Sequence, residues 1–325
     1  MSAARPRIDR EQAVAYRLRV NHLLDRLPAG SYCEATRVGL QDTAPRDALL
    51  GLHARIDGCG PDDWAHPSLI QTYSPRQAVY VLPRRDFGLF TLGRLPDNPE
   101  GTRRIERLAD DICRTLDGRE VRGTAGLPGL RAACASGRIA VRWTTSELWV
   151  REVPRPEIDP DAARRELCLR HVHHFAPSSP PTFAWWAGLS PADARRTWRL
   201  VADQLLEVDF AGGPGWILRS DEPMITRPPV AEGVRLLVAP DLRLFGQDKA
   251  GRFIAPGLRR LSPAADPHHP NAVLVDGRIA GVWGRRGSSV DLVLTEPSSA
   301  ARRTALEQEV ASLPIPDARL RRPLG

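Results

Sequence analysis

The sequence predicts an α+β protein of tandem winged-helix units, each a helix-turn-helix with a β wing, followed by a small β-barrel domain. The first observation is an order of helix, helix and two strands that ends in the alternating segment 138–153. The second is the return of that order within residues 159–218. The third is a C-terminal tail of short apolar strands behind the proline-rich joint 221–230.

The first predicted unit, residues 1–100, opens with two amphipathic helices. Apolar residues recur at helical spacing over 10–27 and again over 46–56, where a helix begins after a cluster of polar side chains. The β-branched and aromatic run 78–82 predicts a strand, and residues 84–95 predict a short helix that ends at a glycine. We interpret this unit as winged-helix-like.

The second predicted unit comprises residues 101–157. A helix is expected over 103–116 and a turn with a short helix over 123–137. The segment 138–153 alternates apolar and polar residues on both sides of Thr144-Thr145-Ser146, as a hairpin wing does.

The third predicted unit, residues 158–226, contains the position of a recognition helix. Helices are expected over 159–175 and 181–188, and Ser190 with the following proline opens a third helix that continues to about Leu206. Two strands around residues 211–215 follow. Three arginines lie on the third helix and are candidates to grip DNA phosphates, the alternative being a solvated helix face. They are Arg195, Arg196 and Arg199.

The last predicted domain, residues 227–325, is dominated by short strands. Asp276-Gly277 between two apolar runs is a strong hairpin signal, and residues 301–313 predict a closing helix. A small barrel or sheet domain accounts for this pattern.

Composition limits the function classes. A chain of 325 residues with 42% hydrophobic residues is too long for a single small binding module. The formal net charge of +7, carried almost wholly by arginine because Lys249 is the only lysine, favours acidic partners such as nucleic acid. Five scattered cysteines and the lack of a long apolar run favour a soluble protein in a reducing cytoplasm, without a membrane segment.

The sequence offers weak candidates for a metal site and for base stacking. Cys168, His171 and His174 step along a helix by three, but no fourth ligand follows at matching spacing, so we expect no metal. Trp185 and Trp186 are able to stack on bases, although a core position suits at least one of them better.

Several segments together resemble the winged-helix DNA glycosylases of the AlkZ and YcaQ type, enzymes that unhook interstrand crosslinks. The segments are Val38–Thr43 with Pro45-Arg46 and Ala48–Arg55, Tyr73–Tyr80, Thr182–Leu189, and Val275–Trp283. The resemblance implies a C-shaped assembly of tandem winged-helix units and a β-barrel, with a basic concave surface for duplex DNA. It implies no metal and no organic cofactor.

The resemblance also implies a catalytic motif of glutamine, an aliphatic residue, and then glutamine or aspartate. An ungapped alignment places Gln41 first, Asp42 in the middle and Thr43 last, so the second glutamine or aspartate is replaced by threonine. In the same alignment Arg46, Arg55 and Arg76 flank the motif.

Each of these residues has a chemical reading and a plainer alternative. The carbonyl of Gln41 can accept a hydrogen bond from a hydrolytic water, Thr43 can hold the same water, and Asp42 can supply negative charge. Asp42 or Thr43 would otherwise cap the helix that starts near Pro45. The flanking arginines are predicted phosphate clamps, unless Arg55 pairs internally with an acid.

The sequence therefore predicts a monomeric DNA glycosylase that acts on bulky alkylated purines of the N7-alkylguanine type, with duplex DNA as its partner. Interstrand crosslinks are included as candidate substrates, in a repair or self-resistance role. The alternatives are a non-catalytic winged-helix DNA-binding protein or regulator on the same scaffold and, less favoured, a protein that sequesters a DNA-reactive compound or its adduct.

Overall fold

The structure is a computed structural model that describes residues 5–42, 44, 46–144, 146–245 and 270–321. It falls into two compact bodies, each assembled from segments far apart in the sequence. The first body comprises Met1–Ile8, Thr36–Ala48 and Ala65–Glu222, and the second comprises Asp9–Ala35, Leu49–Trp64 and Pro223–Gly325. The domain boundaries near residues 100, 157 and 226 stay predictions.

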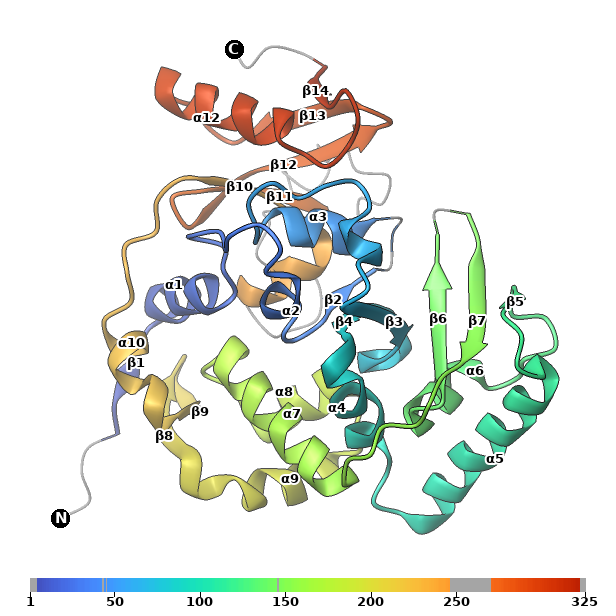
Figure 1. Cartoon of the computed structure of the whole chain (residues 1–325). Helices are drawn as coiled ribbons and strands as arrows, with labels where there is room; N and C mark the ends of the chain where they lie inside the picture. Colours follow the sequence, from blue (N-terminus) through green and yellow to red (C-terminus); the bar gives the residue numbers. More distant parts are fainter. Residues whose placement is uncertain (1–4, 43, 45, 145, 246–269, 322–325) are drawn as a thin grey trace. The chain divides into compact units, whose positions relative to one another are not determined.

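A six-stranded sheet is the centre of the first body (Figure 1). Its order is β2-β4-β3-β6-β7-β5, with every pairing antiparallel. The strands are β2 (Leu40–Gln41), β3 (Leu69–Tyr73), β4 (Val79–Pro83), β5 (Val121–Arg122), β6 (Ile139–Trp143) and β7 (Leu148–Glu152). The predicted hairpin of residues 138–153 is present as β6 and β7, but β3 pairs with β6 and joins this wing to a larger sheet.

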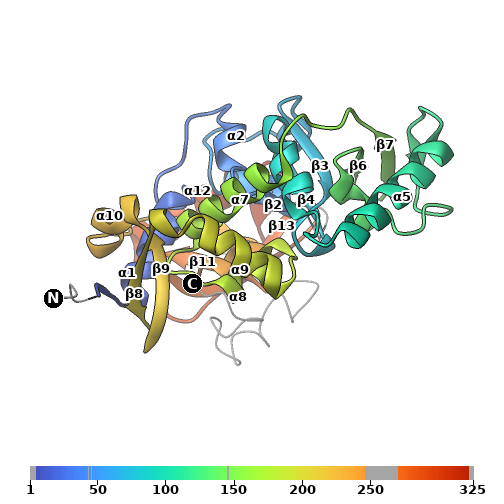
Figure 2. The ribbon, with the colours of Figure 1, turned by 90° about the horizontal axis from the view of Figure 1, so that it is seen from below.

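Helices and single 3-10 turns surround this sheet. They are η2 (Pro75–Gln77), η3 (Arg84–Asp86), α4 (Phe87–Thr91), η4 (Leu92–Arg94), α5 (Pro99–Leu116), α6 (Leu130–Ala133) and η5 (Cys134–Ser136). The predicted helix of residues 103–116 is thus longer, because Asn98 caps it and Pro99 occupies its first turn. In both views α5 lies beside the β6–β7 hairpin (Figures 1 and 2), and its apolar face, Ala109, Ile112 and Leu116, packs in one core with residues of both strands.

The rest of the first body repeats the order predicted for residues 159–218. It contains α7 (Pro160–Phe175), α8 (Pro180–Ala187), α9 (Pro191–Leu200), η6 (Ala202–Gln204), β8 (Leu205–Phe210), β9 (Gly213–Leu218) and η7 (Arg219–Asp221). Ser190 caps α9 as predicted, its side chain accepting the N–H of Asp193. The helix ends at Leu200 and not near Leu206, because residues 205–210 pair with β9. A further strand, β1 (Arg7–Ile8), adds parallel to β8.

The second body contains a five-stranded sheet of order β10-β11-β12-β13-β14. Its strands are β10 (Val234–Leu237), β11 (Asn271–Val275), β12 (Arg278–Arg286), β13 (Ser289–Leu294) and β14 (Arg319–Leu320). Asp276 and Gly277 form the predicted hairpin turn, both with positive φ. Among the described strands β10 and β14 are the edges, so the described part of this sheet is open, and residues 246–269 between β10 and β11 lie outside the described residues.

Helices complete the second body. They are α1 (Arg10–Val20), α2 (Tyr32–Ala35), η8 (Ala239–Phe245) and α12 (Ala300–Ala311). The divisions between the bodies fall within α3 (Asp47–His53), η1 (Asp63–Ala65) and α10 (Glu222–Thr226). Leu306 and Val310 of α12 pack on Leu236 and the fully buried Trp283. The three sheets and these helices confirm the α+β class, and no described helix is long and apolar enough to span a membrane.

Candidate active site

Gln41, the first residue of the predicted motif, ends β2 directly opposite Tyr80 on β4. Its side-chain oxygen accepts a hydrogen bond from Arg76 Nη2 at 2.7 Å and another from the Tyr80 hydroxyl at 3.3 Å. A carbonyl oxygen has two lone pairs, so these two donors fix the orientation of the amide. Tyr80 was not among the predicted site residues, because only the β2–β4 register places it beside Gln41.

Arg76 is presented by a tight turn between β3 and β4. Its backbone lies in the left-handed region at φ 57°, and the neighbouring Ser74 hydroxyl anchors the turn by donating to the carbonyl of Phe90 at 2.7 Å. The guanidinium carbon lies 4.7 Å from the ring centre of Trp185 on α8, a cation–π distance. Arg76 therefore links Gln41 to an aromatic ring from a distant segment.

Gly188 holds α8 close to this turn. It ends the helix with φ 70°, and a Cβ placed on it would lie 3.2 Å from the backbone nitrogen of Arg76. A left-handed C-terminal residue in such close contact favours glycine on both counts.

Asp42 has partners different from those of Gln41. Its carboxylate accepts the N–H of Ala48 in the first turn of α3 at 3.1 Å and the side-chain amide of Gln71 at 3.0 Å. Gln71 in turn accepts the backbone N–H of Trp143 at 2.6 Å. Asp42 is 1% exposed, and burial raises its pKa to about 6. This is the helix-capping alternative, extended into a bridge across the sheet, and Thr43 lies outside the described residues.

The three predicted clamps have different surroundings. Arg76 lies at Gln41, and Arg46 is half-buried with its guanidinium 3.4 Å from the carbonyl oxygen of Trp143. Arg55 is 4% exposed in the second body, where it donates to the carboxylate of Asp241 at 2.6 and 3.1 Å. This is the internal ion pair that the sequence offered as the alternative for Arg55, and its role as a phosphate clamp stays a prediction that would require this buried pair to open.

The arginines of α9 also divide into two kinds. Arg195 and Arg199 are exposed, as DNA contacts require. Arg196 donates to both carboxylate oxygens of Asp161 at 2.6 and 2.9 Å, and this pairing lowers the pKa of Asp161. Arg196 can therefore bind a phosphate through these donors only if its hydrogen bonds to Asp161 break.

The weak candidates of the sequence have structural roles. Trp186 is 3% exposed and packs 5.0 Å from the ring of His171, while Trp185 is half-buried beside Arg76. His171 bonds the Ser178 hydroxyl at 2.8 Å, and Cys168 is fully buried. Among the described residues no group of three or more His, Cys, Asp or Glu is placed to hold a metal ion.

Comparison with known proteins identifies the family. The sequence profile of the family described as DNA glycosylase AlkZ-like matches residues 130–314. The Interstrand DNA cross-link repair glycosylase of Streptomyces sahachiroi is 27% identical over 129 residues, which are 38% of this chain and only 35% of that relative. The solved structure of Streptomyces sahachiroi DNA glycosylase AlkZ has the same fold, with a TM-score of 0.74 at 19% identity over 97% of this chain and 98% of that one. Since the profile covers more than half of its residues, the chain belongs to the AlkZ-like DNA glycosylase family.

Proposed function

We propose that the protein is a DNA glycosylase that hydrolyses the N-glycosidic bond of bulky alkylated purines of the N7-alkylguanine type, interstrand crosslinks included. The observation that carries this proposal is the Gln41 amide in a member of a glycosylase family. Arg76 and Tyr80 donate hydrogen bonds to this amide, and Arg76 also contacts the ring of Trp185. The proposal extends to a monomer that binds damaged duplex DNA on a tandem winged-helix scaffold, without a cofactor. Its role is repair or self-resistance to a genotoxin.

The chemistry demands little from the side chains. An N7-alkylated guanine carries positive charge, so it leaves with the electrons of the bond from C1′ to N9 and becomes neutral without a general acid. Water adds to C1′ and its proton passes to solvent, and the protein must hold that water and stabilise the charge that develops on the sugar. A glutamine amide can do both, because it is a dipole with a carbonyl acceptor.

Arg76 can donate either to Gln41 or to a DNA phosphate. In the structure its guanidinium donates to the Gln41 oxygen that would otherwise accept a hydrogen bond from the water. A DNA phosphate is a stronger partner for arginine than a neutral amide, since the bond is then between two charges. We infer that DNA draws Arg76 to a phosphate and releases the Gln41 oxygen for the water. Asp42 acts as a positioning residue that ties β2 to α3 and to Gln71, and Thr43 is proposed to assist with the water.

The test is base release from duplex oligonucleotides that carry small and bulky N7-alkylguanine adducts. We expect Gln41→Ala to slow release by roughly 10²-fold, the usual loss for one preorganised polar group, with duplex binding retained. Gln308→Ala, which changes an exposed glutamine of α12, is the matched control and should keep the wild-type rate. Asp42→Ala and Thr43→Ala show which neighbour assists. Wild-type rates in Gln41→Ala would contradict the proposed site.

A second candidate is a non-catalytic DNA-binding protein on the same scaffold. The threonine at position 43 and the occupied oxygen of Gln41 favour it. Such a protein would release no base from any adduct while it bound DNA tightly, and as a regulator it would prefer one sequence. A repair enzyme would instead bind undamaged duplexes weakly and with strong salt dependence.

A further inference from the structure

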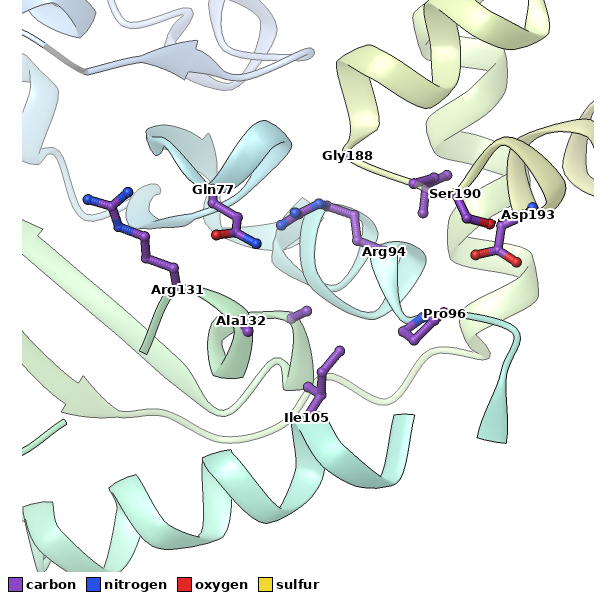
Figure 3. A pocket seen from close by; sticks show the side chains of 11 residues that line it. Gln77, Arg94, Pro96, Ile105, Arg131, Ala132, Gly188, Ser190 and Asp193 are labelled. Atoms are coloured by element: carbon purple, nitrogen blue, oxygen red, sulfur yellow. Dashed lines mark hydrogen bonds between the residues drawn. The ribbon is translucent and has the colours of Figure 1, made fainter. Parts of the chain in front are cut away.

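A pocket of about 210 Å³ lies within the first body. Gln77 of the η2 turn lines it, whereas Gln41 does not. Gln77 from that turn, Arg94 from η4, Arg131 from α6, and Ser190 and Asp193 at the start of α9 line it (Figure 3). The apolar part of its lining comes from Pro96, Ile105, Ala132, Ala135 and Leu189. None of the roles proposed above uses this pocket.

Arg94 is the unusual residue of the pocket. It is 9% exposed, and its Nε donates to the carbonyl of Ala187 at 2.8 Å. Its Nη1 is buried and has no hydrogen-bond partner in the part of the chain that the structure describes. Burial lowers the pKa of Arg94 to about 10, which still leaves it charged at neutral pH.

Two other buried arginines of the described residues are neutralised by carboxylates. Arg55 and Arg164, 4% and 2% exposed, each donate to an aspartate carboxylate. A buried cation costs free energy unless it is paired and hydrogen-bonded. An anionic ligand in the pocket would therefore stabilise Arg94.

The surroundings of Arg94 suit an anion of modest charge. Its guanidinium points toward the side-chain amide of Gln77 in Figure 3, so both groups can donate to one ligand. Asp193 also lines the pocket and offsets part of the charge of Arg94, while the guanidinium of Arg131 points away from Arg94 and lies over the ring of Tyr73. Ser190 begins a ten-residue helix whose N-terminus also favours negative charge.

We propose that this pocket binds a phosphate group, with Arg94 as its principal donor, and that the natural source is the backbone of the DNA strand. The assignment to DNA rests on the proposed function, whereas the phosphate chemistry does not. Gln77 follows Arg76 directly in the η2 turn, and Gly188 of the pocket would place a Cβ 3.2 Å from the Arg76 nitrogen. A phosphate held here would therefore fix the strand beside the turn that carries Arg76.

The first arm of the test uses inorganic phosphate and thermal unfolding. Phosphate should raise the Tm of the wild-type protein more than chloride does at equal ionic strength, because a ligand of the native state stabilises it. Arg94→Gln and Gln77→Glu should each abolish the difference. Arg119→Gln, at an exposed arginine outside the pocket, is the matched control and should keep it.

The second arm measures affinity for undamaged duplex DNA over a range of salt concentrations. Arg94→Gln should weaken binding and reduce the salt slope by about one, the value of one lost phosphate contact. Asp193→Asn should tighten binding, while Asp203→Asn, at an exposed aspartate, should change it less. A merely structural role for the pocket would not give opposite signs at Arg94 and Asp193.

The two arms separate the possible failures. If Arg94→Gln changes neither the phosphate effect nor the salt slope, the site is refuted. If phosphate stabilises the protein but the salt slope is unchanged, the DNA source is refuted and free phosphate is the ligand. If Arg94→Gln unfolds, Gln77→Glu decides. Base release by the wild-type protein tests the glycosylase separately, because neither arm depends on catalysis.

Discussion

At the scale of single residues, the Gln41 site depends on what its neighbours donate. Arg76 and Tyr80 both orient the amide, but only Arg76 also contacts Trp185. We expect Arg76→Ala to slow single-turnover base release by about 10- to 100-fold, because the variant lacks the proposed phosphate contact beside Gln41, and Tyr80→Phe by a smaller factor. Arg76→Lys should recover little, because a lysine cannot form the same planar contacts. Equal effects of Arg76→Ala and Tyr80→Phe would contradict this division of roles.

Asp42 predicts a pH dependence of stability. Its pKa in the native protein is raised to about 6 by burial, so the native state binds the proton more tightly than the unfolded chain does. The stabilisation by the bound proton is complete below about pH 4 and is lost as the pH rises through about 6, a change of about 3 kcal/mol. Asp42→Asn removes this titration. Its free energy of unfolding should therefore rise relative to wild type between pH 4 and pH 7.5.

Chemical denaturation at several pH values measures this difference. An asparagine at this position cannot accept from Gln71 as the carboxylate does, because its own amide nitrogen would face the amide nitrogen of Gln71. The free energy of unfolding of the variant is therefore lowered by an amount that does not depend on pH. Only the pH-dependent part tests the prediction. Asp203→Asn, at an exposed site, is the control. A pH-independent difference between wild type and Asp42→Asn would show that Asp42 does not titrate in this range.

At the scale of elements, the glycine that ends α8 predicts a variant that loses base release as well as stability, whereas a glycine elsewhere predicts a loss of stability alone. Gly188 and Gly212 both have positive φ, of 70° and 82°, so alanine at either position should cost about 1 kcal/mol. A Cβ at Gly212 meets nothing within 4 Å, whereas one at Gly188 presses on the backbone of Arg76 and the guanidinium of Arg94. Gly188→Ala should therefore also lower base release, and Gly212→Ala should not. The comparison fails if both variants lose activity equally.

The elements also show how far local pattern extends. The helices α5, α7, α8 and α9 and the hairpins β6–β7, β8–β9 and β11–β12 appear where periodicity and turn residues predicted them. The strand β3 was not predicted, because Leu69–Tyr73 is buried on both faces and shows no alternation. The predicted helix of residues 10–27 ends at Val20, where Asn21 caps it.

At the scale of the whole molecule, the net charge of +7 predicts salt-sensitive DNA binding. The exposed Arg195 and Arg199 should contribute, and Arg196 less, because Asp161 holds it. We expect the double change Arg195→Gln, Arg199→Gln to reduce the salt slope for duplex binding by about two, against less than one for Arg196→Gln. Titration by fluorescence anisotropy at several salt concentrations measures the slope. A reduction of the salt slope by about one in Arg196→Gln would show that the ion pair with Asp161 opens on DNA.

The sequence by itself determined the α+β class and the order of most elements, because helical and strand periodicity act over a few neighbouring residues. The family resemblance, and not periodicity, made Gln41 a candidate. The tertiary structure alone decided the partners. Asp241, 186 residues away, pairs with Arg55, and Gln71 donates to Asp42. Folding also buries Arg94, whose Nη1 has no hydrogen-bond partner among the described residues. Such pairings are contacts between distant segments, whose register and burial only the folded chain sets.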